Sequence, residues 1–422
     1  MENLSSEPLE PPQSQPESGT GDLSPTVRAL GWVSLCTDIS SEMVYPLTPG
    51  FLTRVLGAPA WAVGLIEGVA ESTASLLKLF SGRLSDRSGR RKPLAVTGYG
   101  LAAVSKPLIA IAGAWPHVLG ARFLDRVGKG LRAAPRDALI AESSAPGERG
   151  RAFGFHRSMD TTGAVLGPLL GWVFLHFFPN AIRSLYALAF VPAMLGVLVL
   201  VLVVREKPKP RVQVLEAALE RQPEPRFTWS GLSLPYRRYL LIVGLFGLGN
   251  SSDAFLLLRA QGVGIRPEQT LLLYAAFNMV EACLGTVAGK MSDRVGRRPL
   301  LAAGYIVFAL TYAGFALLDK LPHPIAAVWA LFGLYGLYST LTQGVQKALV
   351  SDLVHPARRG AETGAFHMLV GIAALPASLL AGWLYAHLSP SAPFAVGAAT
   401  ALLASVLLMF ARPEELGLEA SP

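Results

Sequence analysis

Long apolar segments separated by short polar ones make up most of the 422-residue chain. A helix needs about 20 apolar residues to cross the hydrocarbon core of a bilayer. Runs of that length lie at roughly residues 28–55, 59–83, 93–114, 116–143, 150–178 and 183–204, and again at 237–262, 267–291, 298–318, 323–354, 360–387 and 391–411. The pattern predicts an all-α membrane protein with twelve transmembrane helices in two groups of six.

Polar stretches precede, separate and follow the two groups. The first stretch is rich in Ser, Glu, Pro and Gln and lacks the apolar core of a signal peptide, so we expect a disordered tail. The middle stretch contains a short apolar repeat at Val212, Leu215 and Leu219, which favours a linker with one helix on the membrane surface. The predicted organisation is a tail at 1–27, a half at 28–204, a linker at 205–236, a half at 237–411 and a tail at 412–422.

The two groups of helices share repeated sequences. GRLSDRSGRRKPL at Gly82–Leu94 returns as GKMSDRVGRRPL at Gly289–Leu300, an offset of 207 residues. Ser40–Glu42 likewise returns as Ser251–Asp253, at 211. Two six-helix halves related by an axis along the membrane normal are one architecture of secondary transporters, with the substrate site between the halves. The repeats therefore predict pseudo-symmetric halves and a transport function.

Charge and composition fit a membrane protein better than a nucleic-acid-binding one. Hydrophobic residues make up 51% of the chain and charged residues 16%, with a mean hydropathy of +0.42. The net charge of +8 comes from short basic clusters between the apolar runs, for example at 83–92, 149–151, 294–298 and 358–359. The positive-inside rule places both termini, the linker and the repeated motif in the cytoplasm. We expect a multi-pass monomer in the plasma (inner) membrane, surrounded by lipid and without a nucleic-acid partner.

Motifs for catalysis and for cofactor binding are missing from the sequence. It has no Walker loop, no HExxH and no GxSxG with a plausible triad. Its cysteines, Cys36 and Cys283, lie in apolar stretches of different halves and offer neither a disulfide framework nor a metal ligand set. We therefore expect neither an enzyme nor a bound metal or cofactor.

The repeated motif resembles a signature of the major facilitator superfamily (MFS), and the resemblance extends over residues 28–411. The matching residues are Gly82, Asp86, Arg87, Gly89, Arg90 and Arg91, and Gly289, Asp293, Arg294, Gly296, Arg297 and Arg298. The resemblance implies the MFS fold and a latch of these residues that closes the cytoplasmic side. The alternative is that the basic residues only determine topology.

A second family motif lies in the fifth predicted helix. Gly163, Gly167, Pro168 and Gly171 form the sequence GAVLGPLLG, which is similar to a motif of the drug/proton antiporter branch. Small residues four apart allow close helix packing, and a proline loosens the helix. The resemblance implies gating and export, whereas ordinary packing is the alternative.

The fourth predicted helix has a basic stripe. Arg122, Arg126, Lys129 and Arg136 fall within about 80° of arc at 100° per residue. Charged side chains at membrane depth are costly unless they face the bundle interior or water. Arg122, Arg126 and Lys129 are therefore candidates for binding an anionic substrate, because basic side chains suit phosphates and carboxylates. Internal pairing is the alternative, with Asp125, Asp137, Asp160, Glu67 or Glu71 as partners.

Other candidates come from the first, seventh and tenth predicted helices. Asp38 and Glu42 share one face of the first helix, and Asp253 is the symmetry mate of Glu42. Apolar surroundings favour the neutral form of a carboxyl group, so these residues are candidates for proton coupling. Helix 1 acids also occur in the antiporters that the chain resembles; the alternative is a static ion pair with the basic stripe. Gln343 and Gln346 are candidate substrate contacts across the cavity.

These features predict a secondary transporter that works by alternating access and exports a small polar or anionic solute in exchange for protons. Within transport, the alternatives are proton-coupled uptake of an anionic metabolite or metal chelate, and multidrug export. A membrane sensor or assembly partner that does not transport is the alternative from another class.

Overall fold

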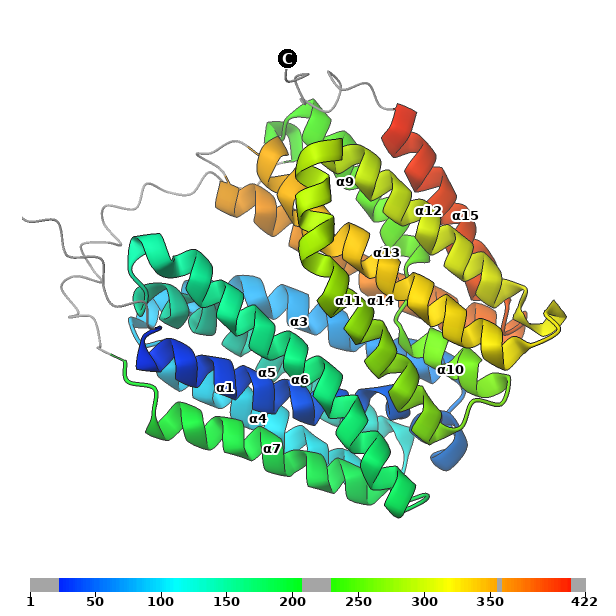
Figure 1. Cartoon of the computed structure of the whole chain (residues 1–422), viewed down its shortest axis with the longest axis horizontal. Helices are drawn as coiled ribbons and strands as arrows, with labels where there is room; N and C mark the ends of the chain where they lie inside the picture. The colour runs from blue at the N-terminus through cyan, green and yellow to red at the C-terminus, as the bar shows by residue number, and fades with distance from the viewer. Residues whose placement is uncertain (1–22, 207–228, 355–358, 411–422) are drawn as a thin grey trace, which may run out of the picture.

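The computed structural model describes residues 23–206, 229–354 and 359–410, and all of their regular structure is helical (Figure 1). Most of the expected N-terminal tail, the expected surface helix at Val212, Leu215 and Leu219, and the expected C-terminal tail lie outside the described residues. The prediction of an all-α protein in two six-helix halves is confirmed.

Six helical segments form the N-terminal half. The first consists of α1 (Pro25–Glu42), a 3₁₀ turn (Tyr45–Leu47), α2 (Thr48–Gly50) and a π turn (Phe51–Val55). The others are α3 (Ala60–Ser88), α4 (Lys92–Ala110), α5 (Trp115–Glu142), α6 (Arg149–Phe177) and α7 (Ile182–Leu202).

Six segments also form the C-terminal half. The first consists of α9 (Leu234–Gly249) and α10 (Ala254–Gly262). The others are α11 (Pro267–Val295), α12 (Arg297–Ala316), α13 (Pro324–Leu353), α14 (Arg359–His387) and α15 (Ala392–Phe410).

The two halves differ in polarity. Seven described segments are long and apolar enough to cross a membrane by length and composition: α7 and all six segments of the C-terminal half. Each of the other N-terminal helices has at least one charged residue in its interior: Asp38, Glu67, Lys106, Arg126 and Asp160 in α1, α3, α4, α5 and α6. The helix interiors of the first half are therefore more polar than those of the second.

The first segment of each half is broken at corresponding positions. α1 ends at Glu42 and the chain passes through a turn with Pro46 and Pro49, while α9 ends at Gly249 and α10 resumes at Ala254. Pro lacks a backbone donor and clashes in a helix interior, which accounts for the first break. Broken helices in transporters expose backbone groups to a substrate cavity.

One glycine of each repeated motif has a conformational role. Gly89 ends α3 with φ of 61°, and Gly296 separates α11 from α12 with φ of 96°. Only glycine adopts positive φ without steric cost, so the motif needs a glycine to turn the chain between two long helices.

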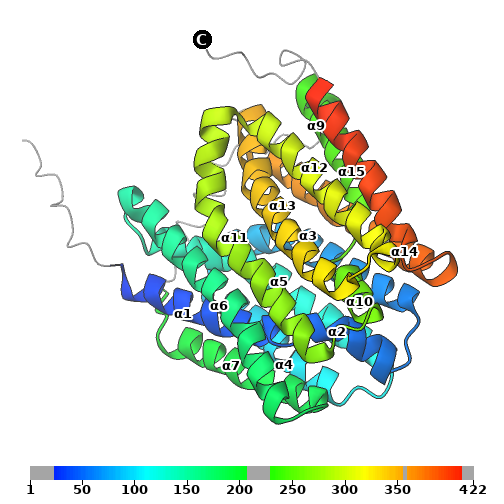
Figure 2. The same cartoon turned by 45° about the vertical axis from the view of Figure 1, so that its right-hand side comes forward.

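The halves contact each other mainly at one side of the bundle. We call the side with the start of α1 and the end of α15 the terminal side, and the opposite one the far side (Figure 1). Toward the far side α3 packs on α14, where a Cβ on Gly64 would lie 2.2 Å from the carbonyl oxygen of Ser378. α10 packs on α2, and Arg54 Nη2 donates a hydrogen bond of 2.6 Å to the carbonyl oxygen of Gln261 (Figure 2).

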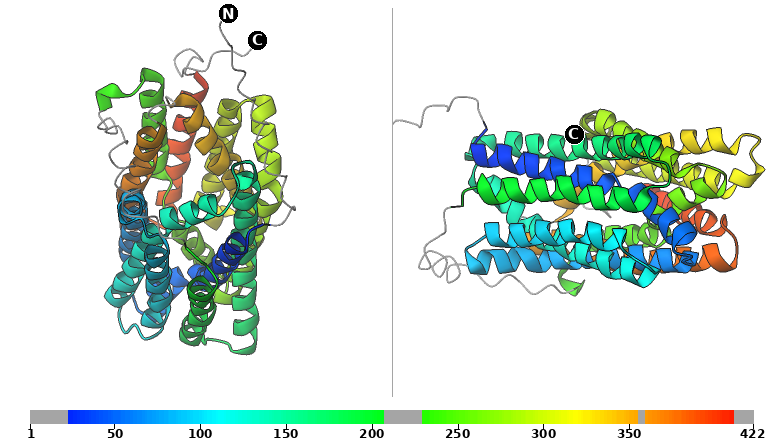
Figure 3. Two further views of the ribbon diagram at one scale, coloured as in Figure 1. Left: turned by 90° about the vertical axis from the view of Figure 1, so that its left-hand side faces the viewer. Right: turned by 90° about the horizontal axis from the view of Figure 1, so that it is seen from below.

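Toward the terminal side the two halves diverge. Seen from that side, they form two separate groups of helices (Figure 3, left). A cavity of about 1130 Å³ lies between them and is lined by Lys78, Arg136, Arg157 and His367, among others. The structure is therefore closed at the far side and open at the terminal side.

A valine at Gly64 should weaken closure of the far side. Its side chain cannot fit beside Ser378, and overpacking of this kind costs about 1–3 kcal/mol. Spin labels at the far-side ends of α3 and α14 should show a population with longer distances by pulsed electron resonance. Gly100→Val is the matched control, because a Cβ on Gly100 meets nothing within 4 Å. Identical distance distributions in both variants would contradict the prediction.

Candidate functional site

A cavity of about 610 Å³ lies between the two halves, at the breaks in the first segment of each half. α1, α3 and α5 provide its N-terminal wall, and α9, α11, α13 and α14 provide most of its C-terminal wall. The sequence-predicted residues Asp38, Glu42, Asp253, Arg122, Arg126, Lys129, Gln343 and Gln346 all line it. The fold thus brings every candidate for substrate binding and proton coupling to one cavity.

Most of the charges in the N-terminal wall are paired with each other. Arg122 Nη2 donates to both carboxylate oxygens of Glu67, at 2.8 and 2.9 Å, and both residues are buried. Arg126 Nη1 lies 3.1 Å from Glu71 Oε1. Lys106 Nζ donates to Asp125 Oδ1 at 3.0 Å. The internal pairing considered for the basic stripe is therefore present for Arg122 and Arg126.

Lys129 differs from the other residues of the stripe. Its side chain is exposed to the cavity, and no acidic side chain in the described part of the chain lies within 4.0 Å of its ammonium group. The next cation of the same helix, Arg132, does have a partner, because its guanidinium group lies over the ring of Tyr99, 4.6 Å from the centroid. A cation over an aromatic face is stabilised without a carboxylate. Lys129 is thus the best available cation of this wall for an anionic ligand.

Asp38 and Glu42 are held next to the glycines of α6. A Cβ on Gly163 would lie 2.9 Å from the Cβ of Asp38, and one on Gly167 would lie 3.1 Å from the Cβ of Glu42. Neither carboxylate has an ion-pair partner among the described residues, and Glu42 Oε2 is buried without a hydrogen bond. The static ion pair that the sequence left open for these acids is not formed in this structure.

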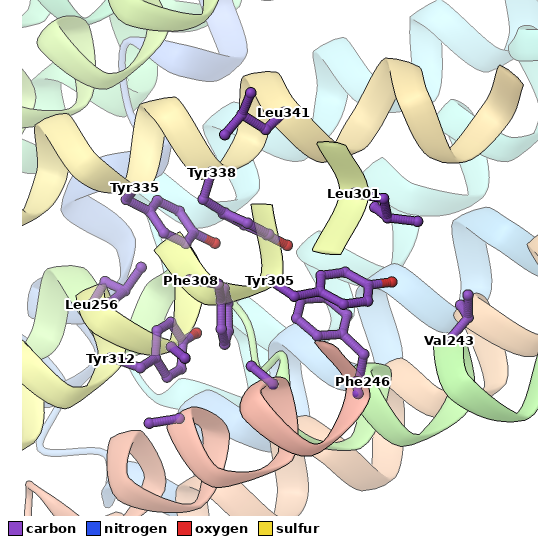
Figure 4. Close-up of a cluster of buried hydrophobic side chains, with 14 of the residues drawn as sticks. Val243, Phe246, Leu256, Leu301, Tyr305, Phe308, Tyr312, Tyr335, Tyr338 and Leu341 are labelled. Atoms are coloured by element: carbon purple, nitrogen blue, oxygen red, sulfur yellow. The ribbon is translucent and has the colours of Figure 1, made fainter. Parts of the chain in front are cut away.

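The C-terminal wall is aromatic and mostly neutral. Phe246, Tyr335 and Tyr338 line the cavity, and they pack against the buried rings of Tyr305, Phe308 and Tyr312 behind them (Figure 4). Tyr335 donates a hydrogen bond of 2.5 Å to Asp253 Oδ1, which is the one charged residue among the lining residues described for this wall. A ligand in this cavity therefore meets charges on one side and aromatic rings on the other.

Gln343 and Gln346 lie on the aromatic side of the cavity. Gln343 Nε2 donates to Ser339 Oγ at 2.6 Å, and Gln346 Nε2 donates to Tyr305 Oη at 3.0 Å. These bonds orient both amides and leave their carbonyl oxygens as acceptors for a ligand.

The predicted gate residues pair within their own halves in this open conformation. Arg91 Nη1 lies 2.7 Å from Glu142 Oε2, and Arg297 Nη1 lies 2.5 Å from Asp352 Oδ2. Arg298 donates to the carbonyl oxygen of Leu408. Asp293 and Arg294 are exposed, whereas the side chains of Asp86 and Arg87 lie outside the described ones. A latch between the halves stays a prediction for the closed terminal side.

The aromatic half of the site was not predicted from the sequence. Tyr335, Tyr338 and Phe246 look like ordinary apolar residues of a span, and only their contacts with Asp253 and Asn250 distinguish them. The break at Gly249–Asp253 did have a signal, because GNSSD is a poor helix former inside an apolar run.

Comparison with known proteins identifies the family. The model of the Major Facilitator Superfamily matches residues 30–259 and 239–421. The chain belongs to this superfamily. As an MFS protein it is an integral, multi-pass membrane transporter with a small-molecule substrate, and not an enzyme.

Two relatives are similar to this chain over most of their length. An uncharacterized MFS-type transporter of Methanocaldococcus jannaschii is 34% identical over 397 residues, or 92% of this chain and 95% of the relative. The multidrug resistance protein MdtH of Photorhabdus laumondii is 25% identical, over 81% of this chain and 82% of that protein.

Solved MFS structures share the fold at low sequence identity. A peptide transporter POT in complex with sulfate superimposes with a TM-score of 0.75 at 17% identity, over 93% of this chain and 95% of that one. The human organic anion transporter MFSD10 gives 0.64 at 17% identity, over 91% and 99%.

Removing Arg122 should destabilise this MFS protein far more than removing Lys129. Arg122→Gln leaves Glu67 buried without its partner, which costs about 3–5 kcal/mol. Lys129→Gln removes an exposed charge and should change stability by no more than about 0.5 kcal/mol. Thermal unfolding of the purified proteins in detergent measures both. Glu67→Gln added to Arg122→Gln should restore part of the loss, and an equal loss in the two single variants would contradict the assignment.

Proposed function

We propose that this MFS protein exports a small polar or anionic solute by proton-coupled alternating access. The observation that carries the proposal is the state of three charged groups in the central cavity. Asp38 and Glu42 have no described ion-pair partner, and Lys129 beside them is likewise unpaired while Arg122 and Arg126 are neutralised. Unpaired acids can bind and release protons, and an unpaired ammonium group can bind an anion.

The terminal side is proposed to face the cytoplasm. The basic clusters at 83–92, 149–151 and 294–298 lie at helix ends on this side, as the positive-inside rule requires for cytoplasmic loops. The open cavity would then receive its solute from the cytoplasm of a cell whose plasma (inner) membrane contains the protein. The glycine motif of α6 and the relative named a multidrug resistance protein favour export.

Uptake of an anion together with a proton is a second candidate. Lys129 lines the same two cavities as Asp38 and Glu42. An anion bound at Lys129 adds negative charge near both acids and therefore favours their protonation. Binding of anion and proton would then reinforce each other, which is the coupling of a symporter.

Multidrug export is a third candidate, and the aromatic wall favours it. Phe246, Tyr274, Phe277, Tyr335 and Tyr338 all line the central cavity. Such rings bind apolar and cationic molecules of varied shape. In this case Asp38, Glu42 and Asp253 would bind the cation, and Lys129 would contribute little.

Flux in proteoliposomes decides among these candidates. Organic mono- and dicarboxylates, their neutral amide analogues and a lipophilic cation are tested under an imposed proton gradient. With a proton gradient directed into the liposomes, anion movement out of them supports antiport. Anion movement into them supports symport. Lys129→Gln should weaken the binding and transport of an anion by about tenfold or more, because a charged hydrogen bond contributes about 1.5–3 kcal/mol. It should leave transport of the neutral analogue unchanged. Equal loss for both would exclude Lys129 as the anion site.

Neutral substitutions of the helix 1 acids should separate proton movement from solute movement. Asp38→Asn and Glu42→Gln, tested singly, should lose gradient-driven accumulation by about tenfold or more and keep solute counterflow. The reason is that an amide cannot carry the proton. Glu268→Gln is the control, because Glu268 lies at the far side and pairs with Arg266 at 3.1 Å. Full gradient-driven accumulation in both variants would exclude these residues as proton carriers.

A further inference from the structure

A row of titratable groups follows the contact between α1 and α6. The two helices run side by side in the same direction, and their backbones touch at successive turns. A Cβ on Gly163, Gly167 or Gly171 would lie 2.7–2.8 Å from the carbonyl oxygens of Leu35, Ile39 and Met43. Residues of α6 therefore stand at the level of α1 residues about 128 positions earlier.

This register orders four titratable groups along the contact. Glu42 lies deepest, and Asp38 is one turn nearer the terminal side. Asp160 accepts a hydrogen bond from Ser34, which is one turn beyond Asp38. His156 is one turn beyond Asp160 on α6, and its Nδ1 lies 3.7 Å from Asp160 Oδ2. By this register the Cα of Asp160 lies at the level of residue 32 of α1, roughly 9 Å from Asp38 along the helix axis, while the other successive groups are about one helical pitch apart, roughly 5.4 Å.

Asp160 connects the helix 1 acids to the open side. It lines the 1130 Å³ cavity together with Asp38 and Glu42, but it does not line the 610 Å³ central cavity. Its side chain is 20% exposed, and no lysine or arginine of the described chain lies within 4.0 Å of its carboxylate.

Titratable and charged groups of several elements line the same cavity as Asp160. They are Asp38 and Glu42 from α1, Glu71 and Lys78 from α3, Tyr99 from α4, Lys129, Arg132, Arg136 and Asp137 from α5, Arg157 from α6 itself, Asp253 from the break before α10, Tyr274 and Glu281 from α11, and His367 from α14. Arg136 is held by Asp137 at 2.8 Å, and Arg157 by Glu281 at 3.0 Å. Both of these arginines are therefore paired with acids other than Asp160.

We propose that Asp160 is a third proton-carrying residue, placed between Asp38 and the water of the terminal side. The O–H bond of protonated Asp38 breaks as an O–H bond forms on Asp160, through water in the cavity that both residues line, and leaves Asp38 as a carboxylate. Asp160 then gives the proton to cavity water, while Ser34 and His156 hold its carboxylate in place. The inference rests on the proposed proton coupling, because Asp38 must first bind a proton.

Labelling with dicyclohexylcarbodiimide tests this without a known solute. The reagent modifies protonated carboxyl groups in apolar surroundings, and mass spectrometry of the full-length protein in nanodiscs locates the modified residues from pH 5 to pH 9. In the wild type we expect labelling of Asp38 and Asp160 that falls as the pH rises. In Asp160→Asn, labelling of Asp38 should end about one pH unit lower or more, because a neighbouring negative charge is removed.

Two matched controls keep the result specific. Asp137→Asn removes a carboxylate that lines the same cavity but is held by Arg136, and it should leave the Asp38 profile unchanged. Glu67 should stay unlabelled in the wild type, since Arg122 holds it as a carboxylate. The wild-type labelling of Asp160 does not depend on the folding of any variant.

The outcomes separate this inference from the proposed function. Asp160 unlabelled at every pH while Asp38 is labelled, or an unchanged Asp38 profile in Asp160→Asn, overturns the role of Asp160 and leaves proton coupling intact. Absence of labelling at both Asp38 and Glu42 overturns proton coupling and this inference with it.

Discussion

The cost of placing charges inside a membrane-embedded bundle governs the N-terminal half. An unpaired charge at that depth costs several kcal/mol, so a buried cation needs an acidic or aromatic partner on a neighbouring helix. Arg122 with Glu67, and Lys106 with Asp125, meet this requirement by linking α5 to α3 and α4. The same ion pairs fix the wall of the cavity, so the rest of the site depends on them.

Ion pairing in the N-terminal wall of the cavity leaves a small set of charged side chains that can bind a solute or a proton. Asp38, Glu42 and Lys129 line the cavity without an ion-pair partner among the described residues, opposite a wall with aromatic rings. The duplicated halves have thus diverged into a charged half and an aromatic half. A solute that bridges the two walls would need a polar end and an apolar body, which describes many small organic ions.

Much of the fold could be predicted from the sequence, because apolar runs, repeated motifs and basic clusters are local signals. Such signals predict the approximate positions of the helices and the two halves. They also predict that the charges of α5 face the inside of the bundle. The pairing of Arg122 with Glu67 could not be predicted, since it depends on how α3 and α5 are placed in space. The aromatic wall was missed for the same reason: Tyr335 gains its role only from its distance to Asp253.

The contact between Gly50 and Gln261 has a consequence for how the duplication could evolve. A Cβ on Gly50 would lie 2.2 Å from Gln261 Oε1, and the two positions are 211 residues apart, the same offset as Ser41 and Ser252. They are therefore equivalent positions of the duplication that meet between α2 and α10. Because the side chain of Gln261 occupies the space beside Gly50, a glutamine at both positions would require one of the two side chains to turn away. The small residue in the first half and the large one in the second thus show that the two copies have diverged where they touch.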